Sequence, residues 1–588
     1  MWCKHGRRSS WGSWFGRTGI IVALFALACS APPQPAPGGG GGQTGRAPGA
    51  AGQPAASAPT APASAVGGVP SAASPGGAAW GEGLEPRRGG ELTFIVGAEP
   101  PSFDGHREST FSMLHWTAPH YSLLVTFDPF DYPRVVGDVA ESWEISPDGL
   151  TYTFKLRDNV KFHDGTPLTS RDVKATYDKI IFPPQGVVSA RRAAYSAVER
   201  VDAPDPHTVV FTLKYPQAAM LSLLASPFNF LYKADILEQD PRWYERNILG
   251  SGPFRFVEYV PGSHWVGRRY EDYHIPGQPY LDGFRAIFVR DPAAQVAAIR
   301  GGRAQIEFRG FAPPQRDDLV RALGNEIVVQ ESPWTCSLYV AFNNERPPFN
   351  DVRFRKALTL AVDRWAGSQA LSQIAIVKEV GGLQRPGSTF AVPPDQLVTF
   401  AGYGRDINAA REQARQLLRE AGVPDGFTFT LKNRDVPMPY EPVGIFLVDQ
   451  WRRIGLNVNH VQQESGPFLN DLRSGDYEAS VDFNCDFMDE PDLQLAKFLS
   501  ADKSPANYGR YNDPVLDDLY DRQSREQNPE ARKQLVWQYE RRVLDEQVYA
   551  MIVLWWQRIV PHHASVKGWK ITPNHYVNQD LRTIWLAQ

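Results

Sequence analysis

The chain has 588 residues, a formal net charge of −4, 12% aromatic residues and four cysteines. Nucleic acid is disfavoured as a partner because phosphate backbones require clustered positive charge, whereas basic pairs such as Arg191-Arg192 are typical of solvated faces. After the low-complexity start described below, about 500 residues remain, which exceeds what one hydrophobic core organises. We therefore expect at least two lobes.

The first residues have the layout of an export signal. A basic start that includes Arg7 and Arg8 precedes the apolar run Ile20–Leu27, which is shorter than the ~20 apolar residues that span a bilayer. Ala26-Leu27-Ala28-Cys29 resembles the lipobox of bacterial lipoproteins, although the family usually has leucine at the position of Ala26. We predict a lipoprotein signal peptide over residues 1–28 and a membrane anchor on Cys29. Secretion with an unmodified Cys29 is the alternative.

Residues 29–90 are rich in proline, glycine, alanine and serine, with almost no large apolar residue before Trp80. Such a composition cannot bury enough apolar surface to offset the entropy of ordering the backbone. We predict a disordered tether, with an r.m.s. reach of roughly 40–45 Å.

The remainder alternates strand and helix signals, which indicates an α/β fold. A strand is predicted over 90–97, followed by a hairpin of 142–145 with 151–156 around the turn Pro147-Asp148-Gly149. Hydroxyl and carboxylate caps and early prolines mark the later helices, and apolar runs mark the later strands. These predicted elements are helices over 172–181 after Thr169 or Ser170, 352–363 after Asn350 or Asp351, 406–422, and 446–455, a strand over 456–459, helices from Pro514 and Pro529, and a strand over 548–556.

One long run carries a specific resemblance. Gly137-Asp138-Val139-Ala140-Glu141-Ser142-Trp143, Ser146-Pro147-Asp148-Gly149-Leu150-Thr151-Tyr152 and Val160-Lys161-Phe162-His163-Asp164-Gly165-Thr166-Pro167-Leu168 follow one another. This run resembles the extracellular solute-binding proteins of family 5, the oligopeptide- and dipeptide-binding components of ABC importers. The resemblance extends over nearly all of residues 91–588.

The resemblance implies a two-lobed clamp of the periplasmic-binding-protein type (class II) with an extra domain. We expect lobe I over 91–122, 250–338 and 559–588, the extra lobe II over 123–249, lobe III over 339–558, and a hinge where the chain crosses near 335–345 and 555–562. Such a clamp binds a peptide by closing and presents it to membrane permease subunits. The expected protein is an extracytoplasmic monomer with no enzymatic activity, cofactor or metal.

The resemblance also suggests ligand-binding residues. Peptide-binding members hold the ligand's α-ammonium with an aspartate four residues before a proline, whereas Asp486 stands five residues before Pro491, which makes Asp489 a rival. Phe483 and Phe487 are expected as apolar walls or as strand core, with Asn484 between them. Glu99 corresponds to a glutamate that faces the ligand in oligopeptide binders, and Tyr121 is a further candidate.

Cys336 and Cys485 are the cysteines that remain after Cys3 and Cys29 are assigned to the leader and the anchor. Outside the cytoplasm two such thiols are often paired, so we predict a disulfide, with two separately buried thiols as the alternative.

Other functions have less support. A sugar or metal-chelate binder with the same clamp is the first alternative, because the many aromatic residues suit sugar stacking. A secreted hydrolase is the alternative of another class, but the chain has no Gly-x-Ser-x-Gly or His-Glu-x-x-His motif.

Overall fold

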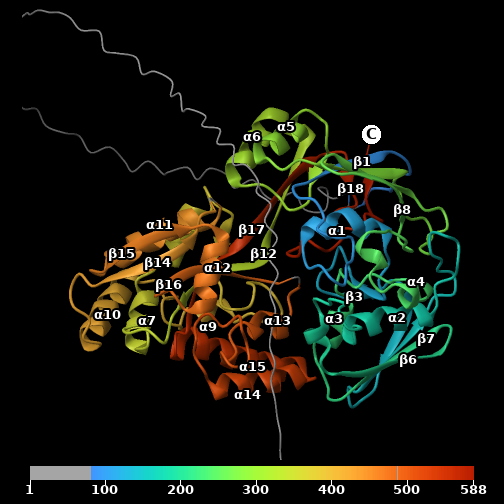
Figure 1. Ribbon diagram of the computed structural model, residues 1–588. Coiled ribbons are helices and arrows are strands. Elements are labelled where there is room, and N and C mark those ends of the chain that lie inside the picture. The colour runs from blue at the N-terminus through green and yellow to red at the C-terminus, as the bar shows by residue number, and fades with distance from the viewer. Residues whose placement is uncertain (1–80, 82, 437, 487, 588) are drawn as a thin grey trace, which may run out of the picture. The chain divides into compact units, whose positions relative to one another are not determined.

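The computed structural model describes residues 81, 83–436, 438–486 and 488–587. The predicted signal peptide, Cys29 and the predicted tether as far as residue 80 lie outside the described residues. Within the described part, no helix combines the length and the apolar character needed to cross a membrane. The described residues form a mixed α/β structure with three main sheets (Figure 1).

A five-stranded sheet opens the folded part, in the order β11-β1-β10-β9-β8. Leu92 and Phe94 of its second strand β1 face one core, whereas Ile95 faces a second core with helices α5 and α6, because successive side chains of a strand point to opposite sides. The predicted strand over 90–97 is β1. The elements of this region are β1 (Glu91–Val96), α1 (Phe111–Thr117), β8 (Phe254–Val260), β9 (His264–Arg269), β10 (Gly283–Phe288), α5 (Pro292–Arg300), β11 (Ile306–Glu307) and α6 (Pro313–Leu323).

A four-stranded antiparallel sheet, β4-β5-β7-β6, contains the predicted hairpin. Ile145 of β4 pairs with Tyr152 of β5, and Gly149 supplies the positive φ of 69° that the turn between them requires. Helix α2 packs Tyr177 against Phe211 of this sheet. The elements are β2 (Val125–Phe127), β3 (Val135–Gly137), β4 (Ala140–Ile145), β5 (Thr151–Leu156), α2 (Ser170–Ile181), β6 (Val198–Asp205), β7 (Thr208–Leu213), α3 (Met220–Leu224) and α4 (Ala234–Gln239).

A six-stranded sheet follows, in the order β13-β17-β12-β16-β14-β15. Leu338 and Val340 of β12 face a core shared with α7, α10 and α11, and Tyr339 faces a core shared with α14 and α15. The strands are β12 (Ile327–Phe342), β13 (Val377–Glu379), β14 (Thr428–Arg434), β15 (Asn457–Gln463), β16 (Ala479–Cys485) and β17 (Ala550–His563). The helices are α7 (Val352–Leu360), α8 (Arg364–Leu371), α9 (Pro394–Leu397), α10 (Ile407–Glu420), α11 (Tyr440–Arg452), α12 (Ser465–Ser474), α13 (Pro491–Ala496), α14 (Pro514–Arg525) and α15 (Pro529–Arg541).

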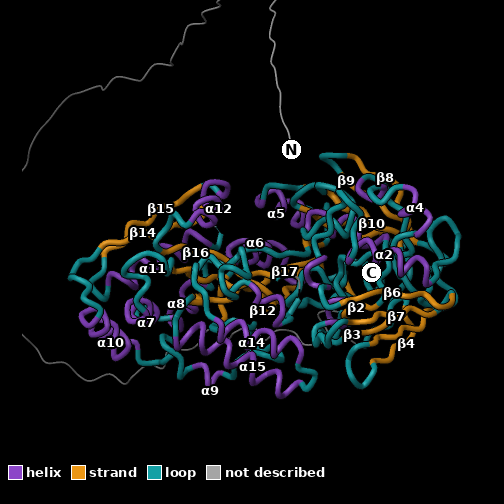
Figure 2. Tube along the Cα trace, turned by 60° about the horizontal axis from the view of Figure 1, so that its bottom comes forward, coloured by secondary structure: helices purple, strands orange, loops and turns teal. Residues whose placement is uncertain are grey.

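The long strands β12 and β17 connect the first and third sheets. They pair from Ile327 with His563 to Ala341 with Ala550, and Figure 2 shows them between β14–β16 on one side and the strands of the four-stranded sheet on the other. Their ladder is regular except for register shifts, the first of which lies between Pro333 and Ser337. An irregularity of this kind bends a ladder locally, and it adjoins the predicted hinge.

Candidate ligand-binding site

Asp486 lies at the end of β16, beside the register shift of β12. The Thr335 hydroxyl donates to the Asp486 carbonyl oxygen at 2.9 Å, and the Asp486 N–H donates to the Thr335 carbonyl oxygen at 3.3 Å. Cys336 and Cys485 are direct cross-strand partners, and the structure joins them by a disulfide bond. Three consecutive links between two strands therefore fix the backbone of Asp486.

The Asp486 carboxyl group is the feature that separates this residue from its neighbours in the described part of the chain. It is partly exposed, and among the described residues no hydrogen bond or ion pair reaches its oxygens. Burial of the carboxyl raises the pKa of Asp486 to about 7, and the positive charge of Lys497 opposes this rise. The Lys497 ammonium itself donates to Asp482 Oδ2 at 2.8 Å and to the Phe483 carbonyl at 2.6 Å. Within the described residues, Lys497 thus acts on Asp486 through its charge and not through a direct contact.

Asp489, the rival residue, is already paired. Its carboxylate accepts from Arg385 Nε at 2.9 and 3.0 Å and from Arg385 Nη2 at 2.7 Å, and the two side chains are only 5% and 9% exposed. The Asp489 N–H also donates to the Tyr132 hydroxyl at 2.8 Å. Because a buried charge requires a partner, Asp489 serves to hold the segment after β16 in place.

The other predicted residues of this segment have different surroundings. Phe483 is partly buried, and the Arg434 guanidinium lies 4.8 Å from the centroid of its ring. Asn484 is buried and donates to both the carbonyl and the side-chain oxygen of Gln494, which fastens β16 to α13. Phe487 lies outside the described residues.

Glu99 and Tyr121 are placed within the first part of the fold. Glu99 is exposed, and its Oε1 accepts from the Tyr259 hydroxyl at 3.0 Å and from the Gly262 N–H at 2.5 Å. Tyr121 is 3% exposed and stacks on Phe230 with ring centroids 4.5 Å apart. In the described structure Tyr121 is thus a packing residue, and no described contact joins Glu99 or Tyr121 to Asp486.

Arg385 and Arg309 were not predicted from the sequence. Arg309 lies near Trp334, next to the predicted hinge. Arg385 is 104 positions from Asp489, and no motif links the two. The local signal for Arg309 is equally weak, because an isolated arginine after a short strand is more often a solvated residue.

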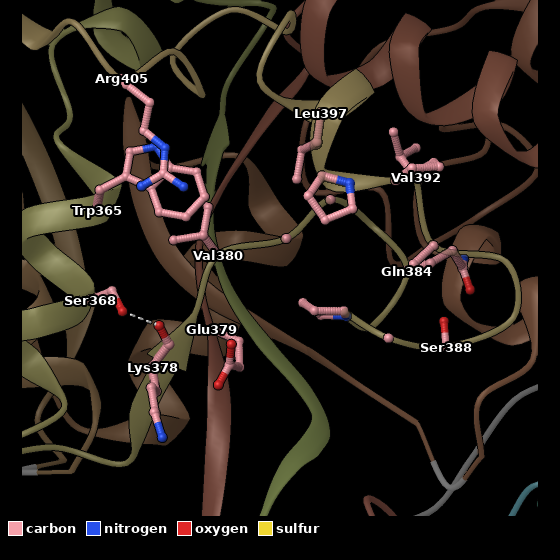
Figure 3. Close-up of a pocket in the computed structure, with 17 residues that line it drawn as sticks. Trp365, Ser368, Lys378, Glu379, Val380, Gln384, Ser388, Val392, Leu397 and Arg405 are labelled. Atoms are coloured by element: carbon pink, nitrogen blue, oxygen red, sulfur yellow. Dashed lines mark hydrogen bonds between the residues drawn. The ribbon is translucent and has the colours of Figure 1, made fainter. Parts of the chain in front are cut away.

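A separate cavity of about 470 Å³ is lined by residues of α8, β13 and α9 (Figure 3). At one side Arg405 lies over Trp365, with the guanidinium 3.4 Å from the ring centroid. Lys378 and Glu379 also line this cavity, and Ser368 donates to the Lys378 carbonyl at 2.5 Å. None of the residues predicted from the sequence as ligand-binding lines it.

The family model for the middle region of the bacterial extracellular solute-binding proteins, family 5, matches residues 134–506, which is more than half of the chain. The chain belongs to this family. The resemblance inferred from the sequence is therefore confirmed.

Two relatives of this chain align with it over part of their length. A Brucella ovis protein named as an ABC transporter peptide-binding protein is 34% identical over 319 residues, 52% of this chain and 55% of the relative. The glutathione-binding protein GsiB of Escherichia coli O1:K1 is 29% identical over 328 residues, 56% of this chain and 61% of the relative. The chain thus matches little more than half the length of these relatives.

Three solved structures share the fold of this chain over most of its length. The peptide-bound periplasmic protein DppA of Helicobacter pylori has a TM-score of 0.67 and 23% identity, covering 85% of this chain and 99% of that one. The substrate-binding protein CtaP of Listeria monocytogenes has a TM-score of 0.74 and 23% identity, covering 85% and 100%. The nonapeptide-bound AppA of Bacillus subtilis has a TM-score of 0.68 and 22% identity, covering 86% and 100%. These likenesses confirm the predicted α/β two-lobed clamp.

Proposed function

We propose that this family 5 protein captures peptides outside the cytoplasm and delivers them, chemically unchanged, to the permease subunits of an ABC importer. One observation carries the proposal: Asp486 is a partly exposed carboxyl group without a described partner, held rigidly beside the hinge strands. The names of the two relatives, which refer to peptide and glutathione binding, support the same class of ligand.

The chemistry of Asp486 suits a peptide amino terminus. Its raised pKa indicates that the carboxylate is poorly stabilised in the empty protein. An ammonium group would provide the missing charge and up to three hydrogen-bond donors, and such charge-assisted bonds are the strong ones. Closure around the ligand would expel water and strengthen the pair, so ligand binding favours the closed clamp.

The three main sheets support the lobe assignment expected from the sequence, with β12 and β17 of the six-stranded sheet passing from one lobe into another. We assign residues 91–122, 250–338 and 559–588 to lobe I with the five-stranded sheet, 123–249 to lobe II with the four-stranded sheet, and 339–558 to lobe III with the six-stranded sheet. Asp486 belongs to lobe III and Thr335 to the last part of lobe I, so their hydrogen bonds cross the assigned boundary. The ligand would lie next to this crossing.

The protein would act as a membrane-anchored binding component and not as an enzyme. The sequence around Cys29 supports a lipidated cysteine, followed by a tether that allows the clamp to reach the permease. Mass spectrometry of the protein from its host would test the anchor through the mass added at Cys29. An unmodified Cys29 would contradict it.

Isothermal titration calorimetry with a panel of di- to pentapeptides tests the function, because binding through the amine requires Asp486. Asp486→Asn should weaken binding at least roughly tenfold, as expected for loss of a charged hydrogen bond. The N-acetylated form of the same peptide should bind weakly to the unchanged protein. Asp489→Asn is the comparison at the rival carboxylate; because it breaks the buried pair with Arg385, thermal unfolding first shows whether it is folded. The proposal fails if the folded variant does not bind while Asp486→Asn binds normally. Release of cleaved peptide would contradict the assignment as a binding protein.

A further inference from the structure

Arg309 is a partly exposed charged side chain that contacts two aromatic rings. Its guanidinium lies 4.0 Å from the ring centroid of Phe111 on α1 and 5.6 Å from that of Trp334 on β12. Within the described part of the chain, no hydrogen bond or ion pair reaches this guanidinium, and its Nε is buried without a partner. The nearby acid Glu307 is buried, and its Oε2 accepts from the Gly310 N–H at 2.6 Å.

The fully buried arginines of the protein show what a structural role looks like. Arg364 donates to the carbonyl oxygens of Ile552, Thr359 and Gly402, and Arg558 donates to those of Thr572 and Phe308. These guanidinium groups close gaps in the backbone hydrogen bonding. Arg309 donates to no described backbone carbonyl oxygen, so packing against the rings does not use its hydrogen-bond donors.

His575 offers a second unused donor beside Arg309. Trp334 Nε1 donates to His575 Nδ1 at 3.1 Å. Because an indole only donates, His575 Nδ1 is the acceptor and the proton of the neutral ring is on Nε2. This Nε2 is buried without a described partner. Burial, followed by the charge of Arg309, lowers the pKa of His575 well below its usual range, so the ring is neutral at physiological pH.

His115 completes this group. Its Nε2 lies 3.2 Å from the His575 carbonyl oxygen and therefore donates to it, which leaves the buried Nδ1 as an unpartnered acceptor. Burial, with Arg309 as the next cause, lowers the pKa of His115 to about 3. The group thus presents one permanent positive charge, the N–H of His575 and one neutral acceptor.

The group adjoins the segment that holds Asp486. Trp334 directly precedes Thr335, whose hydroxyl and carbonyl bind the backbone of Asp486. No described ion pair joins Arg309 to Asp486, so a cation and an acid remain apart in the same part of the protein. Each of these charges is unfavourable without a partner, and a ligand with both an amine and an acid could satisfy both.

We propose that Arg309 is a specificity-determining residue that binds a carboxylate of the peptide, with His575 Nε2 as a second donor. This inference rests on the proposed function, because it assigns a further contact to the ligand that Asp486 holds. A guanidinium suits this role because its planar fork matches the two oxygens of a carboxylate. The carboxylate is either the peptide's terminal group or an acidic side chain.

Calorimetry with two matched peptide pairs tests the inference. The first pair is Ala-Ala-Ala with a free or an amidated carboxyl terminus, and the second is amidated Ala-Glu-Ala or Ala-Gln-Ala. We expect the acidic member of at least one pair to bind roughly 10- to 100-fold more tightly, as for one charged hydrogen-bonded contact. The pair that shows the preference identifies the carboxylate.

Arg309→Gln should remove this preference and leave the affinity for the uncharged member unchanged. Arg405→Gln is the matched control, because Arg405 also stacks on an aromatic ring and has no described ion pair, but lies in the separate cavity. It should keep the preference. Thermal unfolding without ligand shows whether Arg309→Gln is folded, and its melting temperature should equal or exceed that of the unchanged protein because an unpaired charge has been removed.

Two outcomes would overturn the inference alone: peptides that bind through Asp486 without any preference for an acid, or an Arg309→Gln variant that retains the preference. Equal weakening of acidic and uncharged peptides in Arg309→Gln would indicate a structural role and also overturn it. Absence of binding by every peptide to the unchanged protein would overturn the proposed function together with this inference.

Discussion

Arg385 holds the Asp489 carboxylate through two of its nitrogen atoms, at 2.7 to 3.0 Å, in a place where neither side chain is more than 9% exposed. Two aspartates that the sequence could not separate are thereby distinguished. Asp489 is neutralised by the protein, whereas Asp486, three positions earlier, has no described partner for its carboxyl group. This difference supports the proposal that Asp486, and not Asp489, holds the ligand amine.

The pair itself should contribute to stability. Arg385→Gln or Asp489→Leu leaves one buried charge alone and should destabilise the protein by about 3–5 kcal/mol in urea unfolding. The double variant Arg385→Met with Asp489→Leu should be less destabilised than either single change, because no charge remains buried. Arg522→Gln, from an exposed ion pair with Asp518, is the control and should change stability by less than about 1 kcal/mol. The prediction would be contradicted if Arg385→Gln lost no more stability than the Arg522→Gln control.

Peptide affinity should depend on pH through Asp486. With a pKa of about 7 in the empty protein, the carboxyl is protonated in acid and must release its proton before it can pair with an ammonium. Affinity should fall about tenfold per pH unit below pH 7. Above about pH 8 the peptide amine loses its own proton, so affinity should also decline there.

Calorimetry between pH 5 and 9 checks this profile, with Asp486→Asn as the control. The variant should bind weakly and show a much smaller change between pH 5 and 7. An affinity that stays constant over that interval in the unchanged protein would assign the amine to another group.

Asp486 should also reduce the stability of the empty protein. Its pKa in the folded state lies above the ordinary value of 3.8, so the unfolded chain releases this proton more readily, and stability falls as pH rises from about 4 to about 7. At pH 8 Asp486→Asn should be more stable by about 1–2 kcal/mol, and at pH 4 the two proteins should be alike. Urea unfolding at both pH values measures this difference. A variant that is less stable at pH 8 would show that the carboxylate has a structural partner.

Glu540 should affect the pH dependence of stability in the same direction, again because burial raises the pKa of its carboxyl group. It is fully buried, and its two carboxyl oxygens accept from the N–H groups of Leu383 and Gln384. Burial raises its pKa to about 8, whereas these two hydrogen bonds lower it. The stabilisation that protonated Glu540 contributes to the folded state is therefore fully present below about pH 4.5 and is lost as pH rises to about 8.

Glu540→Gln should flatten this pH dependence while it retains an acceptor for one N–H. The free energy of unfolding should change less steeply with pH between pH 5 and 8 in the variant. The difference in slope should correspond to at most one bound proton. Identical slopes in both proteins would contradict the role of Glu540. Glu530→Gln, an exposed glutamate on the same helix, is the control and should leave the slope unchanged.

Reduction of the Cys336–Cys485 disulfide should destabilise the chain. The bridge closes a separation of 149 residues, for which the entropy of the unfolded chain suggests a stabilisation of about 5 kcal/mol before strain is subtracted. Peptide affinity should also fall, because Cys485 directly precedes Asp486. Thermal unfolding and calorimetry with and without reductant measure both effects, after a thiol assay has verified the reduction. Unchanged affinity in the reduced protein would show that Thr335 alone is sufficient to hold Asp486.

Local features were predictable from the sequence because their energy comes from neighbours in the chain. Asp406, Asp513 and Asn528 accept from N–H groups two or three positions later, and helices begin next to them, as expected. The hairpin around Gly149 formed for the same reason. Boundaries that depend on partner strands were less accurate: the strand predicted over 456–459 continues to Gln463, because β14 pairs with it along that length.

The family resemblance suggested a segment for the ligand-binding site, but it could not assign roles to individual side chains. Spacing from Pro491 left Asp486 and Asp489 equivalent, and the resemblance suggested Tyr121, which the structure buries against Phe230. Such roles depend on which side chains meet in space.

The sequence by itself determined the class of the protein, the α/β pattern and the local turns and caps, all of which arise from interactions over a few residues. Only the tertiary structure decided that Arg385 neutralises Asp489 and that Arg309 lies between Phe111 and Trp334 without a described ionic partner. The residues of these groups are far apart in the chain. They come together because sheet pairing and core packing bring separate segments of the chain into contact. These contacts decide whether each carboxylate or guanidinium has a partner of opposite charge.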